Sequence, residues 1–277
     1  MSDSPIYRPH DEAPASATLR AVTPSPAWRG IDVREFEYVS RGDFVGGRLY
    51  LPGAARPRPA PLVFLTHGTG ESARSESLDF ALDWVHLGFA IAAIDLPLHG
   101  RRASPKLSDR LVQAVGALTR GETIDAEGRA LTEEFARQST SDLIRGIDAI
   151  GILDEVDAER IGLVGQGVGA TVSAYLLAHD DRPRACVFIG GAGRFEDAEL
   201  DPATRLAGRS SAKKCPTLVM AITGDPEVSP ASAHALFEAA PEPKEFVEIS
   251  SKAGGTGGLS EKAARRAADF LTRAFER

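Results

Sequence analysis

The chain has few cysteines, no long apolar run and no excess of basic residues. Two cysteines in 277 residues cannot form a disulfide framework, and neither a Cys-x-x-Cys pair nor a His/Cys cluster suggests a metal site. No apolar run approaches the roughly 18 residues that span a membrane. With 32 basic and 39 acidic residues, a formal charge of −7 disfavours nucleic acid and anionic membranes as partners. We therefore expect a cytoplasmic protein with reduced thiols and no metal or other cofactor.

The first 30 residues differ in composition from the rest of the chain. They contain five prolines among polar residues and lack the apolar core of a secretory signal. We expect residues 1–30 to form a Pro-rich arm and residues 31–277 to form a single domain. The whole chain is 43% hydrophobic and 26% charged, which is typical of a globular protein and excludes collagen-like and coiled-coil structures.

Short apolar runs alternate with stretches of helical periodicity after residue 30. Eight strands are expected, at Val33–Val39, Val45–Leu51, Leu62–Thr66, Ala90–Ile94, Arg160–Val164, Ala185–Ile189, Thr217–Ile222 and Glu245–Ile249. Helices are expected at Leu78–Leu87, Leu111–Thr119, Glu133–Leu153, Ala170–Ala178 and Leu259–Phe275. This alternation predicts a doubly wound, mostly parallel, eight-stranded α/β sheet. The connection 190–216 is too short for a large cap domain, so the insert Arg101–Leu131 is expected to shade the ligand cleft.

Three loops follow buried strands, at the sheet edge where open α/β sheets bind ligands. The first has the sequence His-Gly-Thr-Gly (residues 67–70), and the second has Asp-Leu-Pro-Leu-His-Gly (residues 95–100). The third has Gly-Gln-Gly-Val-Gly (residues 165–169) and opens a helix. Asp225 follows a later strand. The order of these motifs along the chain makes this edge the predicted functional site.

These motifs in this order resemble the α/β-hydrolase superfamily over about residues 31–277. The resemblance is strongest to its lidless branch of dienelactone hydrolases, acetyl esterases and prolyl-oligopeptidase-like peptidases. That superfamily carries its nucleophile in a Gly-x-Ser-x-Gly elbow. The resemblance places Gly167 at the serine position and Thr256 at the histidine position, so both appear as vacated triad positions. Asp225 is then the remaining triad candidate.

The resemblance also implies that the oxyanion hole survives. Its donors would be the backbone amides of Thr69 and Val168, with Gly68 and Gln166 as neighbouring candidates. Backbone donors do not need the serine side chain, and the start of a helix at Gly167 adds positive potential. Gln166 is expected to pack behind the elbow more than to face a ligand.

Several other side chains near these loops have two interpretations. His67 is expected to brace the oxyanion loop, as it does in the superfamily. His99 is usually structural there too, but it is the best remaining candidate for a base, because histidine titrates near neutral pH. Glu71 and Ser72 are expected to cap a helix, and Ser72 as a displaced nucleophile is the less favoured alternative.

The missing nucleophile and base make ordinary Ser-His-Asp hydrolysis an unlikely activity, since loss of either costs about 10⁶-fold in rate. The main hypothesis is a pseudo-hydrolase that keeps its oxyanion-hole pocket and binds a small carbonyl or carboxylate ligand, or a protein partner. One alternative is a cyclase, lyase or isomerase that uses the oxyanion hole with Asp225 or His99. Another is a hydrolase whose nucleophile has moved.

Overall fold

The computed structural model describes residues 15–23, 25–209, 214–250 and 259–276. Their strands form one sheet with the order β1-β2-β3-β5-β4-β6-β7-β8-β9. Neighbouring strands are antiparallel from β1 to β5 and parallel from β5 through β9. The strands are β1 (Thr18–Ala21), β2 (Ile31–Ser40), β3 (Asp43–Pro52), β4 (Ala60–Thr66), β5 (Ala90–Ile94), β6 (Val156–Gln166), β7 (Pro183–Ile189), β8 (Thr217–Ile222) and β9 (Lys244–Ile249). The predicted doubly wound, mostly parallel sheet is therefore confirmed.

The prediction of eight strands was wrong by one. Residues Thr18–Ala21 of the expected arm pair antiparallel with β2, from Arg34 to Glu37. This stretch lies between two prolines, carries no proline itself and adds a short strand at the sheet edge, where such strands are tolerated. Part of the arm therefore belongs to the sheet.

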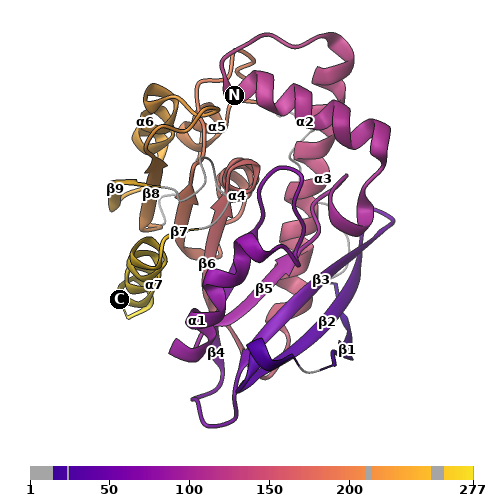
Figure 1. Ribbon diagram of the computed structural model, residues 1–277, viewed down its shortest axis with the longest axis vertical. Coiled ribbons are helices and arrows are strands. Elements are labelled where there is room, and N and C mark those ends of the chain that lie inside the picture. The colour runs from indigo at the N-terminus through magenta and orange to yellow at the C-terminus, as the bar shows by residue number, and fades with distance from the viewer. Residues whose placement is uncertain (1–14, 24, 210–213, 251–258, 277) are drawn as a thin grey trace.

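Helices cover both faces of the sheet (Figure 1). The α-helices are α1 (Leu82–Leu87), α2 (Pro105–Thr119), α3 (Ala126–Gly151), α4 (Val168–His179), α5 (Pro202–Ala207), α6 (Pro230–Ala239) and α7 (Glu261–Phe275). Short 3-10 turns lie at Pro26–Trp28, Glu76–Ala81 and Gly100–Arg102. Two apolar clusters form the core, one with side chains of α1 and α7 and the other with side chains of α2 to α6. In β4, Leu62 and Phe64 join one cluster while Val63 and Leu65 join the other, as the pleat of a strand buried on both faces requires.

Side-chain caps fix where several helices begin, and so fix the loops before them. Asp125 caps α3, Asp201 caps α5, and serines cap α6 and α7. In the described part of residues 190–216 the short α5 is the only helix, which confirms the absence of a large cap domain there. Across the described residues, every helix is too short or too polar to span a membrane.

Candidate functional site

The turn between β6 and α4 keeps the geometry of a nucleophile elbow. Gly167 has φ 52° and ψ −118°, a conformation that disfavours residues with a side chain. A Cβ atom on Gly165 would lie 2.4 Å from the carbonyl oxygen of Gly169, and one on Gly169 would lie 2.3 Å from that of Thr66. The two outer glycines are therefore needed for close packing of β6, α4 and β4. The elbow is intact, while its central residue carries no nucleophile.

A cleft of about 560 Å³ opens at this elbow. Four of the residues predicted from the sequence line it together: Thr69, Gly167, Val168 and Asp225. The opposite wall comes from α2, with Val112, Val115 and Thr119 among its residues. Figure 1 shows α2 crossing the molecule beyond the carboxyl ends of the parallel strands. The expectation that the insert shades the cleft is confirmed.

The two predicted oxyanion amides are free to bind a ligand. Within the described residues, the N–H groups of Thr69 and Val168 make no hydrogen bond. The N–H of Gly68 differs, because it donates to Oε2 of Glu71 at 2.7 Å and is therefore already engaged. Helix α4 also begins without a side-chain cap and without an acidic residue in its first turn. The positive end of its dipole therefore faces the cleft uncompensated by this helix.

Asp225 lies in the turn after β8 and lines the cleft. Its Oδ1 accepts the backbone N–H groups of Glu227 at 2.8 Å and Val228 at 3.0 Å. Glu227 pairs with Arg120, which follows α2, at 2.9 Å. Both members of this ion pair line the cleft, so the pair connects α2 to the loop that carries Asp225.

His67 braces the loop that carries Gly68 and Thr69, as the sequence suggested. Its Nε2 accepts the N–H of Leu96 at 3.1 Å, which assigns the ring proton to Nδ1, and Nδ1 donates to the carbonyl of Gly68 at 2.8 Å. Burial lowers the pKa of His67 to about 4, so the ring is neutral at physiological pH. The role of this histidine is to hold the loop in place.

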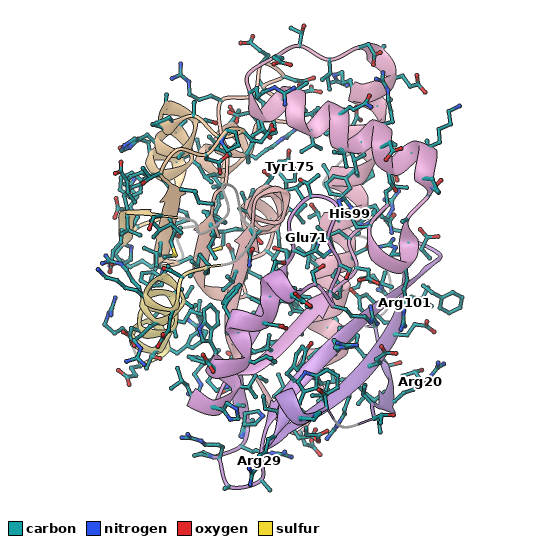
Figure 2. The ribbon with its side chains drawn as sticks, viewed as in Figure 1. Arg20, Arg29, Glu71, His99, Arg101 and Tyr175 are labelled. Atoms are coloured by element: carbon teal, nitrogen blue, oxygen red, sulfur yellow. The ribbon has the colours of Figure 1, made fainter. Side chains whose placement is uncertain are left out.

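His99 is not among the residues that line the cleft. Its ring is only 4% exposed, lies 5.2 Å from the ring of His67, and packs near Phe135 at 5.8 Å. Its Nδ1 lies 2.8 Å from the carbonyl of Pro97, and its Nε2 has no partner in the described part of the chain. Burial lowers its pKa, although nearby acids such as Glu71 oppose this effect (Figure 2). The structure thus separates this candidate base from Asp225.

Three further candidates lie outside the cleft or outside the described residues. Gln166 is 1% exposed and donates to the carbonyl of Ser77 at 3.3 Å, behind the elbow. The hydroxyl of Ser72 accepts the N–H of Arg74 at 3.1 Å, which fits a turn more than a nucleophile. Thr256, the predicted histidine position, lies outside the described residues. Its role stays a prediction.

Sequence analysis did not single out Thr171, which also lines the cleft. Residues four apart on a helix share a face, so Thr171 lies one turn beyond Gly167 on the side of the elbow. The four-residue spacing from Gly167 is the sequence signal that could have predicted Thr171 as a cleft residue. Among the described residues, no group of three or more His, Cys, Asp or Glu side chains could hold a metal ion.

Comparison with known proteins identifies the fold. No family model matches the sequence, and no curated protein matches it. Among solved structures, the chain is similar to an acetyl xylan esterase from Paenibacillus sp. R4, with 18% identity and a TM-score of 0.71 over 94% of this chain and 89% of that one. It is also similar to a cold-adapted esterase from an Arctic intertidal metagenomic library, with 20% identity and a TM-score of 0.66 over 89% and 95% of the two chains. A third, a 2,6-dihydroxy-pseudo-oxynicotine hydrolase, has 19% identity and a TM-score of 0.61 over 87% and 67%.

Identities this low establish architecture and leave activity open, because one fold hosts many chemistries. The first of these structures aligns with 94% of this chain at a TM-score of 0.71, so the similarity extends over the whole sheet and its helices. The chain therefore has the α/β-hydrolase fold.

Proposed function

We propose that this chain binds a small carbonyl or carboxylate compound in the cleft and does not hydrolyse esters. One observation carries the proposal: two unpaired backbone amides, of Thr69 and Val168, line a cleft in which the nucleophile position is a glycine. Preorganised amides of this kind stabilise oxygen atoms that carry negative charge. No serine, cysteine or histidine lies among the described residues that line the cleft.

The size of the expected defect makes the proposal testable. An oxyanion hole and binding alone leave about 10³–10⁴-fold catalysis over water, far below an ordinary esterase. We expect the purified protein to be nearly inert toward p-nitrophenyl acetate and to remain unlabelled by a fluorophosphonate. Labelling of the unmodified chain, lost on mutation of a single serine or threonine, would overturn the proposal in favour of a moved nucleophile.

Binding is tested separately from hydrolysis. A compound that binds the folded state alone raises the unfolding temperature, because it adds RT ln(1 + L/Kd) to the free energy of unfolding, where L is the concentration of the free compound. We expect small carboxylates or ketones to raise it at millimolar concentration. No shift with any of them, together with no chemical-shift change in the Thr69 and Val168 amides by NMR, would reject the cleft as a binding site.

A second candidate function follows from Asp225, whose carboxylate lines the same cleft as the two amides. A carboxylate opposite an oxyanion hole can remove a proton next to a carbonyl while the amides hold the enolate oxygen. This chemistry would suit an isomerase or lyase. Exchange of α-protons of a bound ketone into D₂O, lost in Asp225→Asn, would favour this enzyme over a binding module. His99 supports it less well, because it does not line the cleft.

A further inference from the structure

Thr171 differs from three other threonines within helices of this protein. The hydroxyls of Thr132, Thr140 and Thr272 each donate to the carbonyl four residues earlier, at 2.8, 2.8 and 2.9 Å. Thr171 is 6% exposed and lines the cleft, yet its hydroxyl makes no hydrogen bond within the described residues. The hydroxyl is not among the fully buried atoms without a partner, so it is accessible from the cleft and can bond to a ligand there.

The carbonyl oxygen of Gly167, four residues before Thr171, accepts the N–H groups of Ala170 at 3.0 Å and of Thr171 itself at 3.3 Å. The Thr171 hydroxyl does not bond to it in the described structure. It lies one helical turn beyond the elbow, in the same cleft as the amides of Thr69 and Val168.

We propose that Thr171 and the amides of Thr69 and Val168 together bind a carboxylate group, so that the ligand is a small carboxylic acid in its ionised form. This inference rests on the proposed function and narrows its ligand. An ester carbonyl offers one oxygen to three donors, whereas a carboxylate offers two oxygens with about four acceptor sites. The absent side chain at Gly167 leaves room for the second oxygen.

The charged side chains that line the cleft are two acids, Asp225 and Glu227, and one base, Arg120, so attraction for an anionic ligand has to come from the backbone groups at the elbow. The uncapped start of α4 favours negative charge, because its first amides point at the cleft. The carboxylate of Asp225 is held by two backbone N–H groups, and that of Glu227 by Arg120. Each acid therefore has its own partner, and neither needs the donors at the elbow.

The other residues that line the cleft indicate what the rest of the ligand looks like. Val112 and Val115 of α2 face the cleft together with Ala192 and Val228. These side chains offer apolar contacts, while Gln113, Thr119 and Arg120 add polar groups to the same lining. An acid with a compact, partly apolar body fits this lining.

The experiment compares acids with their own methyl esters. Acetate, butyrate and phenylacetate are titrated beside methyl acetate, methyl butyrate and methyl phenylacetate, with ligand-observed NMR and calorimetry at pH 7. We expect at least one acid to bind roughly tenfold tighter than its ester, as a hydrogen bond to a charged group implies. Thr171→Val, which keeps the shape and removes the hydroxyl, should weaken that acid by roughly tenfold and leave the ester unchanged.

Thr140→Val is the matched control, because Thr140 is 3% exposed on α3 and lies away from the cleft. It should leave acid binding unchanged. Esters that bind as tightly as their acids, or an acid preference that survives in Thr171→Val, would overturn this inference while the proposed function stands. Absence of binding by every probe would overturn both.

Discussion

The side of the elbow that faces the core and the side that faces the cleft hold their polar groups in different ways. On the core side, Asp95 is 1% exposed and both of its oxygens are bonded: Oδ1 accepts the N–H of Ala73 at 2.9 Å, and Oδ2 pairs with Arg74 at 3.0 Å. On the cleft side, the amide of Val168 and the hydroxyl of Thr171 are unbonded within the described chain. Asp95 is thus satisfied by partners within the chain, whereas the two groups on the cleft side have none among the described residues, which is what the proposed ligand site requires.

Several buried atoms outside the cleft, including the hydroxyls of Ser77 and Ser139, are exceptions to this comparison, and two of them belong to residues that the sequence singled out. His99 Nε2 and Gln166 Oε1 are buried and have no partner among the described residues. In each residue, however, the other polar atom is used, by the carbonyls of Pro97 and Ser77. Neither residue lines the cleft, so their unused atoms do not extend the binding site.

The largest effect on stability is expected when the buried hydrogen bonds of Asp95 on the core side are removed. Asp95→Ala leaves Arg74 and two backbone amides without their partner in a buried setting. Removing one member of a buried pair typically costs about 3–5 kcal/mol. Urea unfolding should show a loss of that order in the free energy of unfolding.

The control for this variant is Asp32→Ala. Asp32 pairs with Arg34 at 2.7 Å but is 41% exposed, so its loss should cost less than about 1 kcal/mol. Equal losses in the two variants would show that burial of Asp95 does not set its contribution.

The next largest effect is the dependence of stability on pH that arises from His67. The pKa of His67 is about 4 in the folded protein because of burial, against an ordinary value of 6.5. Between pH 4 and pH 6.5 the unfolded chain therefore binds a proton at this position more readily than the folded protein does. The contribution of the neutral ring to the free energy of unfolding is fully present above pH 6.5 and is lost as the pH falls toward 4. The loss amounts to about 3 kcal/mol.

Urea unfolding at pH 7.5 and pH 4.5 measures this change. His67→Asn should lower the difference between the two pH values, while His86→Asn, at an exposed position of α1, should leave it unaltered. A difference as large in His67→Asn as in the parent would assign the pH dependence to other groups, such as His179, whose pKa burial also lowers to about 4.

A smaller effect is expected when the cleft side is restored to a catalytic arrangement. Gly167→Ser with Thr256→His should allow weak labelling by a fluorophosphonate, which the parent lacks, because serine and imidazole would then join Asp225. The serine enters at φ 52°, so the variant should lose about 1–3 kcal/mol of stability. Gly42→Ser, at φ 85° with open space around it, controls for that backbone cost. A folded double variant that stays unlabelled would mean that Thr256 is not the histidine position.

Sequence reasoning located the sheet and the elbow because both rest on strong local signals. The continuous apolar runs of β4 and β5 lie within two residues of their predicted bounds, and the glycines of residues 165–169 mark the elbow directly. Strand β1 escaped prediction because its four residues are mostly exposed and lack an apolar face. Helix α6 was missed as well, since its mixture of alanine and polar residues gives little periodicity.

The candidate site was predictable where backbone position alone decides. Thr69, Val168 and Asp225 follow the ends of their strands, so parallel topology brings them together. His99 also follows a strand, but its ring turns toward His67 and Phe135, and only three-dimensional packing determines that direction. For the same reason, the sequence did not indicate which helical threonine lacks a backbone partner.

The smallest effect is expected at the mouth of the cleft, where the ion pair between Arg120 and Glu227 is solvent-exposed. Glu227→Gln removes a negative charge and leaves Arg120 paired with Glu122, at 2.8 Å. A carboxylate probe such as butyrate should then bind a few-fold tighter at low salt, and the gain should vanish near 0.5 M salt, where charges are screened over only about 4 Å. Stability should change little, as for other exposed pairs.

The preference for an acid over its methyl ester, which Thr171→Val is expected to remove, should by contrast persist at high salt in the unmodified protein. The reason is that salt screens a buried hydrogen bond poorly. If salt erases both effects equally, the donors at the elbow act as a diffuse positive field, and the distinction between bonded and free groups does not explain recognition.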